Sequence, residues 1–103
     1  MRKDLLRIIP GEPCIIIEVN DRELQPTREV FEYLEKELRQ LPLNRGYCIV
    51  TRVPWAAAFI SHELHPTRFV AVYDEESRSF IVVERHVKDV EIGEKIRPMF
   101  YSD

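Results

Sequence analysis

The chain has 103 residues, 45% of them hydrophobic and 32% charged, with a formal net charge of −3 at pH 7. This balance predicts one soluble globular domain over residues 1–103 and argues against a disordered chain. The net charge argues against a general nucleic-acid or DNA coat, because neutralising phosphates needs a basic face. The N-terminal apolar stretch is too short for a secretion signal and no stretch is long enough to cross a membrane, so we expect a cytoplasmic protein.

The N-terminal half predicts two strands and a helix. Strands are expected at 5–9 and 14–19, joined by a Pro-Gly-Glu-Pro turn. Thr27 is a suitable N-cap for the helix that follows, and Pro42 is expected to stop it. The apolar stripe of that helix comprises Val30, Phe31, Leu34, Leu38 and Leu41.

The C-terminal half predicts a strand, a second helix and a group of strands. The second helix begins at Pro54, a favourable first position, and is apolar almost all round, so we expect it to pack on the sheet or in an oligomer interface. The resulting order, β-β-α-β-α-β-β, indicates an α/β fold with a mixed sheet and two helices, either ferredoxin-like or a reduced Rossmann-like sandwich. The expected elements are a strand at 46–53, the helix at 54–64, strands at 68–73 and 79–84, and a short strand within 90–100.

The two cysteines, Cys14 and Cys48, stand alone in separate apolar stretches. There is no CxxC pair of the kind that binds zinc. We therefore expect two buried free thiols in a reducing compartment, and neither a disulfide nor a zinc site.

The segment SHELHPTRFVAVYDE, residues 61–75, carries the clearest candidates for chemistry. His62 and His65 are three apart on a helix and so share one face, where they suit a metal or a phosphate. The same pair near a helix C-terminus also gains from the helix dipole without any function. Asp74 ends a strand and opens a turn, where aspartate is common for local reasons.

The topology predicts that these candidates lie apart. A strand, a helix and a strand over 46–73 form a βαβ unit, whose strands run parallel. His65 then lies at one edge of the sheet, with His86 nearby, and Asp74 lies at the other, about 20 Å away. Within one chain His65 and Asp74 cannot act on the same atom, so a site that uses both must be shared between subunits.

The edge that holds Asp74 is also a candidate anion site. It is the C-terminal edge of the parallel strands, where ligands bind in open α/β sheets. Thr51, Arg52 and Val53 lie there at the start of a helix, and Arg78 lies in the adjacent hairpin. The alternative for both arginines is a surface salt bridge with Glu75 or Glu76.

The segment HELHPTRFVAVYDEESRSFIVVERH, residues 62–86, resembles the core of a ring nuclease family associated with type III CRISPR systems. Members of that family carry a histidine pair three apart, then a threonine, a phenylalanine and a VAVYD strand. The later EIGEKI resembles the family's glycine-containing tail, and Arg52 with Pro54 resembles the end of its Arg-Gly-Pro loop. The resemblance covers about residues 47–97, and the N-terminal half agrees in element order.

The resemblance implies a manganese-dependent enzyme that binds and cuts cyclic tetra-adenylate, the second messenger of type III CRISPR defence. It implies homodimers that stack into a tetramer or filament, with each active site shared between dimers. His65 and Asp74 match the catalytic positions and the expected Mn²⁺ ligands, and His62 matches the family's other histidine. Thr51 and Arg52 match the ligand-binding loop, to which we add Val53 and Arg78 as substrate-binding candidates.

Three alternatives stay open on the sequence. A cyclic-nucleotide sensor or sponge would bind the same ligand without cutting it. A manganese-dependent exonuclease acting on RNA 3′ ends would take short RNA as its partner. An interaction protein without a nucleotide role would use the apolar helix as its interface.

Overall fold

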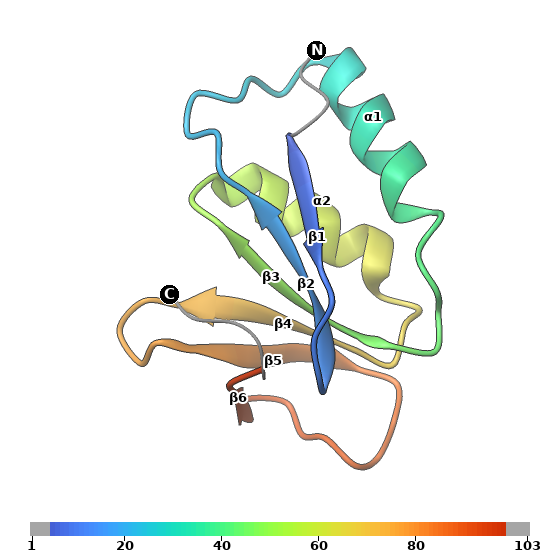
Figure 1. The fold of residues 1–103 in the computed structure, drawn as a ribbon, viewed down its shortest axis with the longest axis vertical. Coiled ribbons are helices and arrows are strands. Elements are labelled where there is room, and N and C mark those ends of the chain that lie inside the picture. The colour runs from blue at the N-terminus through green and yellow to red at the C-terminus, as the bar shows by residue number, and fades with distance from the viewer. Residues whose placement is uncertain (1–4, 99–103) are drawn as a thin grey trace.

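The structure is a computed structural model and describes residues 5–98. The elements follow the expected order β-β-α-β-α-β-β, and the short strand expected near the C-terminus adds a sixth strand (Figure 1). The expected α/β fold with a mixed sheet and two helices is therefore confirmed. The elements are β1 (Leu6–Ile9), β2 (Cys14–Val19), α1 (Arg28–Leu38), β3 (Gly46–Thr51), α2 (Pro54–Leu64), β4 (Phe69–Asp74), β5 (Ser79–Arg85) and β6 (Lys95–Ile96).

The six strands form one sheet in sequential order, β1 to β6. The pairs β2–β3 and β3–β4 are parallel, whereas β1, β5 and β6 are antiparallel to their neighbours. Each parallel pair is joined by a helix, because a parallel connection must cross from one edge of the sheet to the other. The parallel centre corresponds to the reduced Rossmann-like architecture of the two that the sequence allowed.

Both helices pack on the same face of the sheet. This face is apolar because alternate side chains of β2, β3 and β4 meet the buried stripes of α1 and α2. The buried contributors are Ile15, Ile17 and Val19 of β2, Val30, Leu34 and Leu38 of α1, Tyr47 and Ile49 of β3, Ile60 and Leu64 of α2, and Val70 of β4.

The opposite face, which we call the helix-free face, carries a second apolar cluster. Central parallel strands bury both faces and so read as continuous apolar runs, as β2 and β3 do here. The side chains of this cluster alternate with those of the first along each strand. Its buried members are Cys14, Ile16, Cys48, Phe69, Ala71, Phe80, Val82 and Ile96.

The first helix begins as predicted and ends earlier than expected. The Thr27 hydroxyl accepts a hydrogen bond from the Val30 amide at 3.3 Å, which makes Thr27 the N-cap. The helix ends at Leu38 with Arg39 as its C-cap, so Leu41 lies in the following turn. Leu41 nevertheless packs against the core, and this packing explains why it extends the apolar stripe.

The second helix is apolar on most sides because it contacts both the sheet and α1. Ala56, Ile60 and Leu64 are buried against the sheet, which confirms the expected packing. On the α1 side, the Phe31 ring lies 5.2 Å from Trp55 and 4.9 Å from Phe59, measured between ring centres. No helix within residues 5–98 is long and apolar enough to cross a bilayer.

The prediction of two free thiols is wrong, because Cys14 and Cys48 form a disulfide. They lie on the neighbouring strands β2 and β3, where Ile16 is the register partner of Cys48. The two cysteines therefore lie on one face of the sheet, two residues out of register. Their Cα atoms are 5.9 Å apart, a usual disulfide spacing.

Candidate functional site

A hollow of about 950 Å³ opens at the C-terminal edge of the parallel strands. The strands β2, β3 and β4 all end at this edge, as expected for an α/β ligand site. The hollow takes residues from these three strands and from the loops that follow them. Its lining consists of Glu18, Asn20, Arg22, Val50, Thr51, Arg52, Tyr73, Glu75 and Arg78.

The floor of the hollow is a row of side chains on the helix-free face. Glu18 is the register partner of Val50 across the β2–β3 pair. Tyr73 comes one residue after Val72, the register partner of Ile49 across the β3–β4 pair, and so lies beside Val50. The Tyr73 ring packs edge-on against Phe80, with ring centres 5.2 Å apart. The floor is therefore apolar and aromatic towards β4, and carries a carboxylate towards β2.

Three arginines surround this floor, each from a different loop. Arg22 lies between β2 and α1, Arg52 between β3 and α2, and Arg78 in the β4–β5 hairpin. Arg78 adopts a left-handed backbone conformation, with φ of 53°, which turns the chain within that hairpin. One guanidinium group can donate two parallel hydrogen bonds to the oxygens of one phosphate. These three arginines, which we call the rim, therefore suit a ligand with several phosphates.

The carboxylates of Glu18 and Glu75, which also line the hollow, partly offset the positive charges of the arginines. The Nε of Arg52 lies 3.6 Å from Oε1 of Glu75, and both side chains are mostly exposed. An exposed pair of this kind contributes little free energy, so Arg52 can exchange Glu75 for a ligand phosphate. The salt bridge expected from the sequence as the non-functional alternative is thus present for Arg52, and because it is weak, Arg52 can also serve in ligand binding.

The loop from Thr51 to Pro54 holds itself together. The Thr51 hydroxyl accepts a hydrogen bond from the Val53 amide at 3.1 Å. The Val53 side chain is buried and Val53 is the N-cap of α2, with Pro54 in the first turn. Of the four substrate-binding candidates, Thr51, Arg52 and Arg78 line the hollow, whereas the buried Val53 is not among its lining residues.

Asp74 ends β4 at the same edge, but it is not one of the residues that line the hollow. Because side chains alternate along a strand, Tyr73 lies on the helix-free face and Asp74 on the other. Its Oδ2 accepts hydrogen bonds from the Ser77 hydroxyl at 2.7 Å and the Ser77 amide at 3.2 Å. These bonds, led by the hydroxyl, lower the pKa of Asp74, so its carboxylate stays ionised into the acid range.

All three histidines gather at the opposite edge of the sheet. The ring centres of His62 and His65 are 5.9 Å apart and those of His65 and His86 are 6.1 Å apart. Nδ1 of His65 lies 2.9 Å from the carbonyl oxygen of His62, and the backbone amide of His86 donates to the carbonyl of Arg68. These contacts confirm that His86 lies beside His65, and all three side chains are exposed.

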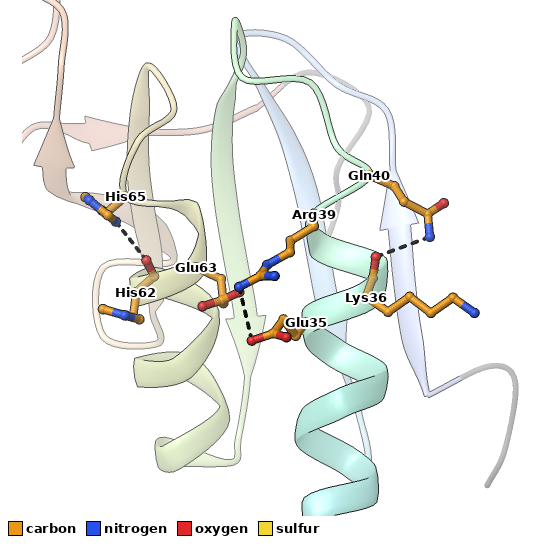
Figure 2. A network of polar contacts seen from close by, with 7 residues as sticks. All are labelled: Glu35, Lys36, Arg39, Gln40, His62, Glu63 and His65. Carbon is orange, nitrogen blue, oxygen red and sulfur yellow. Dashed lines mark hydrogen bonds and ion pairs between the residues drawn. The ribbon is translucent and has the colours of Figure 1, made fainter.

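The histidine-bearing end of α2 is tied to α1 by an ion-pair network (Figure 2). The Arg39 guanidinium lies 3.6 Å from Oε1 of Glu63 on α2 and 3.3 Å from Oε2 of Glu35 on α1. Figure 2 shows Glu63 pointing towards α1, while His62 and His65 lie on the other side of α2. The network therefore links the last turn of α2 to the end of α1 without using the histidines.

His65 and Asp74 lie beyond opposite ends of β4, and so at opposite edges of the sheet, as the topology predicted. His65 precedes the strand and Asp74 is its last residue, and six strand residues span about 20 Å. Within residues 5–98, no group of three or more His, Cys, Asp or Glu side chains is placed to hold a metal ion. The pair expected to bind Mn²⁺ thus does not fit a metal site within a single chain.

Of the lining residues, Glu75 was named from the sequence only as a salt-bridge partner, and five were not named at all: Glu18, Asn20, Arg22, Val50 and Tyr73. Asn20 and Arg22 directly follow the predicted strand at 14–19, so the same strand-end rule that selected Thr51 and Arg52 would have found them. The others lie within strands. No sequence signal showed on which face of the sheet the hollow opens.

A model of a CRISPR-associated protein family (Cas_csx3) matches residues 18–97, which is 80 of the 103 residues. The matched range begins at Glu18 on the floor of the hollow and includes both sheet edges described above. None of the curated protein sequences compared with the chain matches it.

Proposed function

Because the chain belongs to the CRISPR-associated protein family Cas_csx3, we propose that it binds and cleaves cyclic tetra-adenylate and so switches off type III CRISPR signalling. The observation that carries this proposal is the hollow with three arginines at the C-terminal edge of the parallel strands. A cyclic tetranucleotide has four phosphates, and a ligand of that charge needs several cationic groups at separate points.

The hollow of one chain would hold part of such a ring. Arg22, Arg52 and Arg78 come from three loops, so their guanidinium groups can meet phosphates at different places on the ligand. Two copies of the chain related by a two-fold axis would present two such hollows to the whole ring. Homodimerisation is therefore part of this proposal.

Cleavage requires a second dimer, because His65 and Asp74 occupy opposite edges of one sheet. In a head-to-tail stack, His65 of one dimer would face the C-terminal edge of the next. There His65 would move a proton at the scissile phosphodiester, since imidazole both accepts and donates protons near neutral pH. Mn²⁺, which accepts imidazole and carboxylate ligands, is proposed as cofactor of this shared site alone, where it would polarise the phosphodiester.

A sensor or sponge that binds the ring without cutting it is the second candidate. The hydrogen bonds between Asp74 and Ser77 favour it, because they give Asp74 a complete role in the hairpin turn. Binding by the arginine rim would not require Asp74 at all. The two candidates therefore share a ligand and differ in turnover.

One experiment separates them. Purified protein is incubated with cyclic tetra-adenylate and Mn²⁺, and linear products are followed by chromatography. Linear products at a rate proportional to protein support the nuclease, whereas tight binding with an intact ring after long incubation shows a sensor.

The shared site has its own test. His65→Ala and Asp74→Ala proteins are each expected to be inactive, and a mixture of the two should regain activity, because some mixed interfaces contain both intact residues. Mass spectrometry of the mixture checks that subunits exchange. No recovery despite exchange would exclude a site shared in this way.

A further inference from the structure

The floor of the hollow places an aliphatic and an aromatic side chain beside a carboxylate. Val50 and Tyr73 lie side by side on the helix-free face, and Glu18 is the register partner of Val50. A planar heterocycle resting on an aromatic and an aliphatic side chain gains stacking and apolar contact. A ring in that position would extend towards the carboxylate of Glu18.

Glu18 is mostly buried and accepts two side-chain hydrogen bonds. Its side chain is only 12% exposed, and its Oε1 accepts from Nη1 of Arg7 at 3.4 Å and from Nδ2 of Asn20 at 3.1 Å. Within residues 5–98, both of these bonds go to the same oxygen. Two positioned donors on Oε1 leave Oε2 as the acceptor for a ligand, and an ionised carboxylate only accepts hydrogen bonds.

We infer that Glu18 reads the exocyclic amino group of an adenine base that lies on Val50 and Tyr73, while the rim arginines hold the adjoining phosphates. This inference rests on the proposed function and adds a specificity-determining residue to it. An adenine amino group donates a hydrogen bond to the carboxylate. The oxo group at the same place in hypoxanthine is an acceptor and is repelled by it.

The position of the two donors gives the inference a sharp consequence. In Glu18→Gln, the amide oxygen should turn towards Arg7 and Asn20, because an amide nitrogen in the place of Oε1 would set a donor against their donors. The amide nitrogen then takes the place of Oε2 and presents a donor to the base. The variant should therefore prefer an oxo ring, whereas the wild-type protein prefers an amino ring.

The experiment measures the affinities of the full chain for cyclic tetra-adenylate and cyclic tetra-inosinate by calorimetry at one salt concentration. The wild-type protein should bind the adenylate ring at least about tenfold more tightly, the effect of one hydrogen bond to a charged group. Glu18→Gln should abolish or reverse this ratio. Glu75→Gln is the matched control, because it removes the same charge from the lining of the hollow and should leave the ratio unchanged.

Each outcome decides between the two proposals. Equal affinity of the wild-type protein for the two rings overturns the inference, and this comparison does not depend on how well a variant folds. A ratio retained in Glu18→Gln, or lost equally in Glu75→Gln, also overturns it. Selective binding without cleavage supports base reading and refutes the nuclease, whereas equal cleavage of both rings does the reverse. Failure to bind either ring overturns both.

Discussion

Reduction of the Cys14–Cys48 disulfide should strongly destabilise the protein. The bond joins β2 to β3 across a sequence separation of 34 residues, and both cysteines are fully buried in the cluster on the helix-free face. A cross-link of that span lowers the entropy of the unfolded chain, and the chain-entropy relation gives about 4 kcal/mol at 25 °C. We expect reduction to lower the free energy of unfolding by about this amount.

The assay is urea unfolding with and without reductant, followed by the fluorescence of the single tryptophan. That tryptophan, Trp55, packs on Phe31 between the two helices and so reports loss of the core. With a urea dependence of about 1–3 kcal/mol/M, a loss of 4 kcal/mol moves the midpoint down by at least about 1.3 M. Cys48→Ala is the control, because without the cross-link its midpoint should be low and insensitive to reductant. An unchanged wild-type midpoint after reduction, with thiol titration confirming two free thiols, would refute the reasoning.

Three further predictions concern single side chains. Gly46→Ala should destabilise by about 1–3 kcal/mol in thermal melts, because its Cβ would overlap the buried ring of Phe69; an unchanged melting temperature would contradict this. Thr27→Ala should lower the free energy of unfolding by about 1 kcal/mol, because α1 loses its N-cap. Thr27→Ser should keep most of this stabilisation. Ser77→Ala should raise the pKa of Asp74 towards its ordinary value in a carboxyl NMR titration, and an unmoved titration would show that Ser77 does not lower it. Since the folded pKa is depressed, the stabilisation from Asp74 is complete above the ordinary pKa and is lost as the pH falls through the lowered one.

The order of elements was predictable because its signals are local. Thr27 and Pro54 mark the starts of the two helices within a few residues, and continuous apolar runs such as those of β2 and β3 are typical of central parallel strands. The end of α1 was less well predicted. Leu41 packs on the core from a turn, and an apolar stripe cannot distinguish that position from one more helical turn.

The sequence predicted which edge of the sheet holds each candidate residue, but not which face of the sheet carries the hollow. The βαβ connection alone placed His65 and Asp74 apart and put Arg52 at the C-terminal edge. It could not show that the hollow opens on the helix-free face, where Glu18 and Tyr73 contribute and Asp74 does not. That choice depends on which face both helices cover, and therefore on how the strands twist and pair.

The sequence by itself determined the fold class, the sheet edges and the resemblance of residues 47–97 to a CRISPR-associated family, because all three depend on residue order and short-range patterns. Only the tertiary structure decided what the strand register brings together. Register pairs Ile16 with Cys48 and so joins two cysteines that stand 34 residues apart. It also aligns Glu18 with Val50, which makes the floor of the hollow. A shift of one residue would turn every one of these side chains to the other face, so no local pattern could have fixed them.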